Sequence, residues 1–282
     1  MSNIQLVADS TCDLSPELLE KYHIAVIPLC IVMDDKSYYD KEEISPEEIY
    51  KWADANRTTP KTAAASYERA METLQPFMDA GDDIIFIGIS EQMSTTCNVI
   101  RLIKDDQNYD KLHVIDSMSL STGIGLQLLY AAELIADGKK AEEVVERVEQ
   151  RRYRVRASFV VDTLTYLARG GRCSSVTALL GNTLKLKPQI VVERGSMGVY
   201  KKFRGKQASV IMKYAKELEE ALLHADPSCV FVTHSGCDDA IVNEVVSYLE
   251  SLDYFGKIYV TTAGGVISSH CGPGTLGVLF YA

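Results

Sequence analysis

Hydrophobic and polar residues follow two alternating patterns in the first half of the chain. Short β-rich runs are separated by amphipathic stretches that have the period of a helix. We expect strands over residues 4–8, 24–33, 83–89 and 111–115, and helices that begin near residues 15, 45, 66, 94 and 122. Strands separated by helices of about 10–15 residues predict a Rossmann-like parallel sheet with helices on both faces.

Three stretches of the first half differ from that pattern. Asp34-Asp35-Lys36 follows an apolar run and predicts a small hairpin. Residues 56–65 are polar and are expected to form a connection. Residues 140–156 are strongly charged, which is typical of a solvated helix, and we expect this helix to link two domains.

The second half combines a hairpin with a series of strands and helices. Residues 187–193 and 198–203 flank Arg194-Gly195-Ser196, which is a turn signal. We expect further strands over residues 157–161, 229–233, 257–262 and 276–281, and helices over residues 207–225 and 238–252. A hairpin within such a series indicates a mixed sheet. The sequence therefore predicts two α/β domains, residues 1–157 and 158–282.

The composition is that of a globular protein, since 46% of the 282 residues are hydrophobic and 24% are charged. Asp and Glu outnumber Lys and Arg by 39 to 29, which gives a formal net charge of −10. This balance argues against a nucleic-acid partner held by phosphate contacts. No apolar run approaches the roughly 18–20 residues of a membrane span, so we expect at most transient membrane contact.

Cysteine usage and the N-terminus predict a cytoplasmic location. The seven cysteines are scattered along the chain and none forms a C-x-x-C pair, so neither a disulfide framework nor a zinc site is expected. The chain enters a predicted strand at once, with no basic region before an apolar stretch, and therefore lacks the pattern of a secretory signal.

Hydroxyl side chains gather where the predicted strands end. The strand over residues 83–89 is followed by Ser90 and then by Ser94-Thr95-Thr96. In an open parallel sheet the ligand crevice lies outside the carboxyl ends of the strands, and hydroxyls beside helix N-termini suit a carboxylate or phosphate. Each hydroxyl can instead simply cap the next helix. Ser94 is the strongest candidate, because its neighbours supply more hydroxyls than one cap needs.

Several catalytic and nucleotide-binding motifs are missing. The sequence contains no G-x-x-x-x-G-K-[ST] loop, and no G-x-G-x-x-G follows the first predicted strand. Gly88-Ile89-Ser90-Glu91-Gln92 approaches a nucleophile elbow but lacks the second glycine. A serine hydrolase would therefore require Ser94 and His270 to meet in the fold. No histidine pair has metal-ligand spacing, and we expect three histidines to be structural or surface residues: His23, His113 and His224.

Three motifs of the second half are candidates for function. In Leu167-Ala168-Arg169-Gly170-Gly171-Arg172, two guanidinium groups flank a glycine pair, although basic residues beside a glycine cap also simply end a helix. Residues 200–206 form a basic cluster that includes Arg204 and that could equally be a solvated strand end. Residues 263–274 hold His270 between glycines, in a segment that we expect to be irregular, and a histidine in such a loop is a candidate site residue.

Taken together and in this order, these motifs resemble the DegV family, the fatty-acid-binding proteins that partner a fatty acid kinase. The resemblance extends over essentially the whole chain. The motifs that carry it are Val7-Ala8-Asp9-Ser10-Thr11-Cys12-Asp13-Leu14, Pro60-Lys61-Thr62, Ile89-Ser90 with Met93-Ser94, Asp116-Ser117, Tyr166-Leu167 with Gly170-Gly171-Arg172, Leu186-Lys187-Pro188, Lys202-Phe203-Arg204, Thr233-His234-Ser235-Gly236-Cys237 and His270-Cys271-Gly272-Pro273-Gly274.

The resemblance implies two α/β domains that hold a long-chain fatty acid, with its carboxylate buried and its tail in a tunnel. By motif position, Thr62, Ser94 and His270 would bind the carboxylate, and the fatty acid would be a ligand with no further cofactor. Thr95, Arg172 and Arg204 would support the head group or face the kinase. The chain departs from the family at Ala63-Ala64-Ala65, where Ser-Gln-Pro is common, and at Thr95, where Gly is usual.

The expected function is that of a carrier without a catalytic nucleophile, which presents a fatty acid to a separate kinase for conversion to acyl phosphate. Two enzymatic alternatives stay open: a kinase subunit that holds a small ketone through His270, and a hydrolase that uses Ser94 and His270. A third alternative is a regulatory module that only senses the lipid. A long apolar tunnel would favour the lipid, whereas a compact polar pocket would favour the ketone.

Overall fold

A parallel sheet of four strands, in the order β2-β1-β6-β7, organises the first half of the chain in the computed structural model, which describes residues 3–177 and 186–282. Its strands are β1 (Ile4–Asp9), β2 (Ile24–Ile27), β6 (Asp83–Gly88) and β7 (Leu112–Asp116). Side chains of a strand alternate between the two faces. In β6, Ile85 and Ile87 accordingly enter one buried cluster, and Ile84 and Phe86 enter another.

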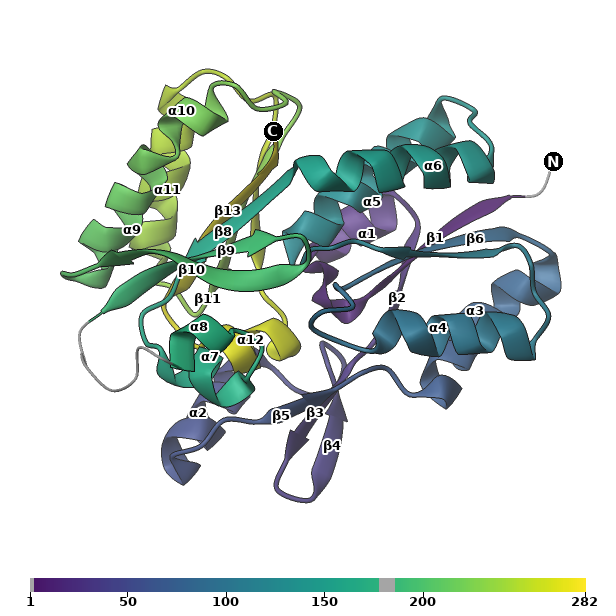
Figure 1. Ribbon diagram of the computed structural model, residues 1–282, viewed down its shortest axis with the longest axis horizontal. Helices are drawn as coiled ribbons and strands as arrows, with labels where there is room; N and C mark the ends of the chain where they lie inside the picture. Colours follow the sequence, from purple (N-terminus) through teal and green to yellow (C-terminus); the bar gives the residue numbers. More distant parts are fainter. Residues whose placement is uncertain (1–2, 178–185) are drawn as a thin grey trace.

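Helices cover both faces of this sheet, as the sequence predicts (Figure 1). One face packs against α3 (Tyr67–Ala80) and α4 (Thr96–Asp106). The other face packs against α1 (Pro16–Lys21), α5 (Thr122–Ala136) and α6 (Ala141–Arg151). The short 3-10 helices η1 (Ser10–Cys12) and η2 (Arg152–Arg154) follow β1 and α6.

The second half forms a mixed sheet of six strands in the order β10-β9-β8-β13-β11-β12. Its strands are β8 (Val155–Val160), β9 (Lys187–Glu193), β10 (Ser196–Phe203), β11 (Val230–Ser235), β12 (Ile258–Thr262) and β13 (Thr275–Tyr281). β9 and β10 form the expected antiparallel hairpin, and β11 and β12 are parallel. The outer face is covered by α9 (Gln207–Glu217), α10 (Glu219–Leu222) and α11 (Asp239–Ser251).

A small antiparallel sheet, β4-β3-β5, lies beside the junction of the two large ones. It consists of β3 (Cys30–Met33), β4 (Lys36–Tyr39) and β5 (Lys61–Ala63), and α2 (Pro46–Asn56) follows β4. The hairpin of β3 and β4 confirms the prediction from Asp34-Asp35-Lys36. The expectation of an irregular connection over residues 56–65 is wrong at β5, because these three residues pair with β3 and place Thr62 opposite Ile31.

Three short helices fill the junction: α7 (Thr165–Gly170), α8 (Ser174–Thr177) and α12 (Gly265–Cys271). Figure 1 shows α12, in yellow, between the mixed sheet and the small sheet. The segment that includes His270 was expected to be irregular, and that expectation is wrong. Its backbone forms a helix whose N-terminal amides are bound by side chains from far away in the sequence.

α5 joins the two halves through a shared core. Ten of its residues are buried, and it contacts strands of both large sheets. We propose that residues 1–157 and 158–282 are separate domains that pack closely across α5, with the boundary inside β8. In the part of the chain that the structure describes, no helix is long and apolar enough to span a membrane.

Candidate functional site

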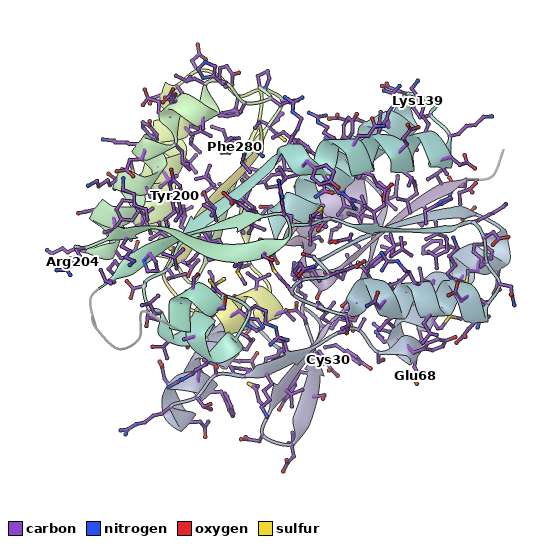
Figure 2. All side chains as sticks on the ribbon, in the orientation of Figure 1. Cys30, Glu68, Lys139, Tyr200, Arg204 and Phe280 are labelled. Atoms are coloured by element: carbon purple, nitrogen blue, oxygen red, sulfur yellow. The ribbon has the colours of Figure 1, made fainter. Side chains whose placement is uncertain are left out.

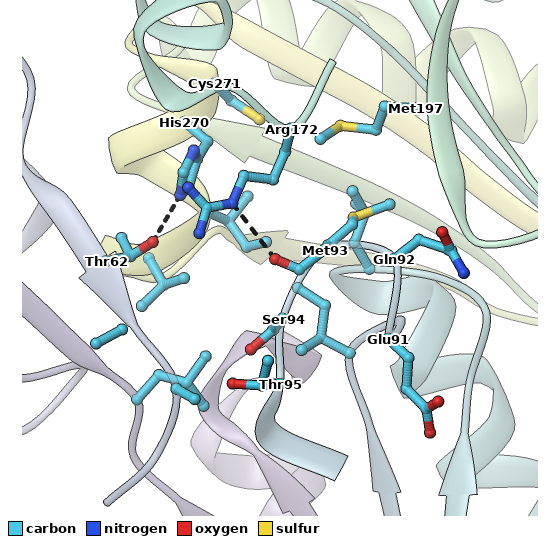
Figure 3. A pocket seen from close by; sticks show the side chains of 17 residues that line it. Thr62, Glu91, Gln92, Met93, Ser94, Thr95, Arg172, Met197, His270 and Cys271 are labelled. Carbon is cyan, nitrogen blue, oxygen red and sulfur yellow. Dashed lines mark hydrogen bonds between the residues drawn. The ribbon is translucent and has the colours of Figure 1, made fainter. Parts of the chain in front are cut away.

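A cavity of about 510 Å³ lies where α12, β5, α7 and the turn after β6 come together (Figure 3). This volume is in the range of about 300–1,000 Å³ that is usual for small-molecule sites. Thr62, Ser94, Arg172 and His270 all line it, although they are spread over more than 200 positions of the sequence.

His270 and Thr62 form the most direct contact in the cavity. Nε2 of His270 lies 2.8 Å from Oγ1 of Thr62, a hydrogen bond that connects α12 with β5. Nδ1 of His270 is buried and has no hydrogen-bond partner among the described residues. The ring packs against Gly170 at the end of α7, where a Cβ atom would overlap Nδ1. Gly170, the first glycine of the sequence motif, therefore provides space for this imidazole.

His270 is neutral at physiological pH. Burial, and after it the positive charge of Arg172, lower the pKa of His270 to about 4. The tautomer with hydrogen on Nε2 donates to Oγ1 of Thr62, which leaves the Thr62 hydroxyl free to donate to a ligand. This arrangement offers hydrogen-bond donors to an anion.

Ser94 lies on the turn between β6 and α4. Its Oγ accepts a hydrogen bond from the backbone N–H of Thr96 and lies 2.9 Å from Oγ1 of Thr96. Ser94 therefore binds the first amide of α4, although the N-cap residue of that helix is Thr95, and it also lines the cavity. Asp9 stabilises the start of this turn, because its Oδ2 accepts a hydrogen bond from the backbone N–H of Ile89 at 2.7 Å.

Arg172 extends across the cavity toward this turn (Figure 3). Its Nε donates to the carbonyl oxygen of Met93 at 3.4 Å, and a terminal nitrogen donates to that of Gly170 at 2.8 Å. Thr95 also lines the cavity. Arg204, in contrast, is exposed beyond the end of β10, is absent from the cavity lining, and makes no hydrogen bond or ion pair with the described residues (Figure 2).

The rest of the cavity is mostly apolar. Leu29, Ile89, Met197 and Val266 contribute to its wall, together with Ala63 and Ala64 of the segment that departs from the family pattern. A second, smaller cavity of about 30 Å³ shares three lining residues with the first, Leu120, Ile267 and Cys271, and is also lined by residues of β8, β11 and β13. Burial raises the pKa of the Cys271 thiol to about 12, so this side chain is a neutral wall residue.

The other strand-end hydroxyls serve the fold. Ser117 and Ser119 are buried, and Ser117 Oγ donates to the carbonyl oxygen of Ser119 and accepts from its backbone N–H. The Ser119 hydroxyl has no hydrogen-bond partner among the described residues, and Ser10 donates to Asp40. Sequence reasoning missed Asp13 and Asp40, two buried carboxylates that bind backbone amides at the start of α12. Asp13 is part of the opening motif, but a motif does not show which amide a carboxylate will reach.

Comparisons with known proteins identify the family of the chain. A family model described as "Uncharacterised protein, DegV family" matches residues 3–282. A DegV domain-containing protein of Clostridium acetobutylicum is 32% identical, over 100% of this chain and 99% of its own length.

Two solved structures are similar over nearly their whole length. A DegV family protein from Thermus thermophilus, described by its fatty acid binding, has a TM-score of 0.90 and 28% identity, over 99% of each chain. A stearic acid-binding protein from Eubacterium ventriosum has a TM-score of 0.85 and 28% identity, over 100% of this chain and 98% of the other. By sequence and by fold, the chain belongs to the DegV family.

Proposed function

We propose that the protein binds a long-chain fatty acid in the 510 Å³ cavity, with the carboxylate at Thr62, Ser94 and His270. The observation that carries this proposal is the convergence of neutral hydrogen-bond donors at one end of an otherwise mostly apolar cavity. A buried carboxylate must be hydrogen-bonded, and the hydroxyls of Thr62 and Ser94 can donate to it. The imidazole N–H of His270 donates to Thr62 and so orients the Thr62 hydroxyl toward the ligand without adding a negative charge.

Arg172 supplies the positive charge near the head group. Its side chain lies in the lining of the same cavity and is close enough to His270 to lower the pKa of that imidazole. A guanidinium group therefore offsets the carboxylate charge in a protein whose net charge is −10. Hydrogen bonds from Arg172 to two backbone carbonyls hold the group in place before a ligand arrives.

The tail of the acid would follow the apolar wall toward the smaller cavity. Leu120, Ile267 and Cys271 separate the two cavities, and their side chains would move apart to admit the end of a long chain. Burial of an acyl tail supplies about 0.8 kcal/mol for each CH₂ group. This apolar contribution favours a lipid over a small ketone, which would gain little from such a wall.

The hydrolase alternative needs a hydrogen bond between Ser94 and His270. In the described residues the partner of Ser94 Oγ is Thr96, and that of His270 Nε2 is Thr62. His270 therefore makes no hydrogen bond to Ser94 through which it could take up the Ser94 proton, as a hydrolase requires. We therefore favour a carrier that leaves the chemistry to its partner.

We further propose that the carrier presents the acid to a separate, ATP-dependent fatty acid kinase. The kinase would transfer the γ-phosphoryl group of ATP to a carboxylate oxygen, which gives acyl phosphate and ADP. Arg172 at the cavity and Arg204 on the surface could contact the acyl phosphate and the kinase, respectively. A carrier of this kind acts in the cytoplasm, where ATP is available.

Extraction of the purified protein with organic solvent, followed by mass spectrometry, tests the ligand. Protein expressed in a bacterial host should yield about one fatty acid per chain. Absence of fatty acid, together with no binding of added acid, would refute the proposal. Formation of acyl phosphate in the presence of a fatty acid kinase and ATP tests the presentation of the acid to the kinase. A module that only senses the lipid would give no acyl phosphate in this assay.

A further inference from the structure

Two buried carboxylates from the first half of the chain hold the N-terminus of α12. Oδ1 of Asp13 accepts a hydrogen bond from the backbone N–H of Gly264 at 2.8 Å. Oδ1 of Asp40 accepts one from the N–H of Gly265 at 2.7 Å. The N-cap residue of α12 is Gly264, which has no side chain to supply a cap. These carboxylates therefore take the place of a local cap and bind the first amides of the helix.

Both carboxylates are fixed on their second oxygen as well. Ser121 Oγ donates to Oδ2 of Asp13 at 2.6 Å, and Ser10 Oγ donates to Oδ2 of Asp40 at 2.8 Å. Lys41 Nζ lies 3.3 Å from Oδ1 of Asp13 and supplies a positive charge. Asp13 and Asp40 are each only 1% exposed. Burial of a carboxylate costs free energy unless the group is paired and hydrogen-bonded. Because hydrogen bonds reach both oxygens of each carboxylate, the two side chains are held in fixed positions.

The glycines of α12 permit close contact with this framework. A Cβ atom on Gly265 would lie 2.6 Å from Cδ1 of Ile31 and 2.8 Å from Cδ1 of Ile49. A Cβ atom on Gly264 would lie 2.5 Å from Cε of Lys41. The backbone of α12 therefore packs directly on β3, α2 and the Asp40–Lys41 segment, and its start has little freedom to shift.

The other end of this short helix carries His270. α12 has seven residues and a length of about 10 Å, so its two ends move together as one rigid unit. Its start is bound to Asp13 and Asp40, and near its end His270 bonds to Thr62. All three partners belong to the first half of the chain, whereas α12 belongs to the second.

We propose that Asp13 and Asp40 are positioning residues, which fix α12 so that His270 meets Thr62 in the head-group site. Neither carboxylate lines the 510 Å³ cavity, so both act through the helix. The consequence for fatty acid binding rests on the proposed function. The placement of His270 itself does not, and it can be measured without a ligand.

Double-mutant cycles test the positioning role in the full-length protein with palmitic acid as the probe. Asp13→Asn and Asp40→Asn should each weaken binding at least fivefold in the wild-type background. In a His270→Ala background the same substitutions should change affinity by less than about twofold, because the residue that they position is gone. In a Ser94→Ala background they should keep their full effect.

Asp9→Asn is the matched control. Asp9 is also fully buried, but its Oδ2 binds the N–H of Ile89 and thus the turn that carries Ser94. Its effect on affinity should persist in the His270→Ala background. If Asp13→Asn and Asp40→Asn also kept their full effect in that background, or if Asp9→Asn lost its effect there, the proposal would be overturned.

The imidazole resonances of His270 provide the test without ligand. The chain has five histidines, and the imidazole signal that is missing from the spectrum of His270→Ala is that of His270. Loosening of α12 should hydrate the ring and raise the pKa of His270 from about 4 toward its ordinary 6.5. The loss of a negative charge alone would lower this pKa. An unchanged or lower pKa in Asp13→Asn and Asp40→Asn would therefore overturn the proposal, even if the protein bound no fatty acid.

Milder variants serve if the aspartate substitutions prevent folding. Ser121→Ala and Ser10→Ala each remove one hydrogen bond to a carboxylate and leave the carboxylate in place. Each should raise the pKa of His270 in the same direction by a smaller amount. No change in either variant, with the fold intact by circular dichroism, would contradict the positioning role.

Discussion

Nε2 of His270 and Oγ1 of Thr62 lie 2.8 Å apart, and this hydrogen bond joins a helix near the end of the chain to a short strand of the first half. The two residues are 208 positions apart. Their contact places a neutral imidazole and a hydroxyl at one end of a mostly apolar cavity, beside Ser94 and Arg172. The proposed binding of a carboxylate depends on this contact.

Removal of either hydroxyl should weaken binding of the acid. Thr62→Val and Ser94→Ala should each cost about 1–3 kcal/mol, or roughly 5- to 150-fold in affinity, because a buried carboxylate loses a donor. Thr62→Ser retains the hydroxyl and should retain affinity near that of the wild type. Calorimetry with palmitic acid measures these effects. Equal affinity of Thr62→Val, Ser94→Ala and the wild type would contradict the site assignment.

A methyl group at position 170 should displace His270. A Cβ atom on Gly170 would overlap Nδ1 of the imidazole, so Gly170→Ala should break the bond to Thr62 and weaken binding about tenfold or more. Gly198→Ala is the control, since a Cβ atom there has no neighbour within 4 Å. An affinity of Gly170→Ala that matched Gly198→Ala would show that the ring tolerates displacement.

The charge of Arg172 should be visible in the titration of His270. Its positive charge is the second cause, after burial, of the lowered pKa of this imidazole. Arg172→Gln should therefore raise the pKa of His270 above about 4, as measured by NMR of the free protein. A pKa that stays constant or falls would mean that the guanidinium does not face the imidazole in solution.

Protonation of His270 should destabilise the native state in acid. Its pKa is about 4 in the native state and near 6.5 when unfolded, so the unfolded state binds more protons between these values. Stability contributed by this group is present above pH 6.5 and is lost as the pH falls to 4, by up to roughly 3 kcal/mol.

The wild-type curve alone does not isolate this effect. Burial raises the pKa of Asp9 from 3.8 to about 6. Between these values the native state binds more protons than the unfolded state, so a fall in pH through this range stabilises the native state and opposes the effect of His270. The measurement is therefore urea unfolding of the wild type and of His270→Gln at several pH values. The stability of the wild type relative to the variant should fall between pH 6.5 and 4. A difference that does not vary with pH in this window would argue against a buried, neutral His270.

The two large sheets could be predicted from the sequence because local patterns determine them. β6 is a continuous apolar run, α3 buries Ala70, Leu74 and Met78 at helical spacing, and the Arg194-Gly195-Ser196 turn marks the β9–β10 hairpin. The long helix expected over residues 207–225 is divided in two: α9 ends at Glu217, and the short helix α10 follows. Such patterns identify elements better than their ends.

β5 and α12 could not be predicted, since tertiary contacts stabilise both. β5 has only three residues, and its pairing partner lies about 30 positions away in β3. α12 contains one glycine and two serines, which have low helix propensity, and the amides at its start are bound by Asp13 and Asp40. Thr62 was identified as a site residue only through the family resemblance, because β5 has no local signal. His270 was a candidate from its position between glycines, but its partner Thr62 and its role at the carboxylate came from the resemblance.

Titration of the delipidated protein with palmitic acid and with its methyl ester tests the central claim most directly. The two ligands have the same tail, and only the acid has a carboxylate that can accept hydrogen bonds from the hydroxyls of Thr62, which His270 orients, and Ser94. We predict saturable binding of one palmitic acid per chain, and binding of the ester at least tenfold weaker. No binding of the acid, or equal affinity for the acid and the ester, would contradict the account.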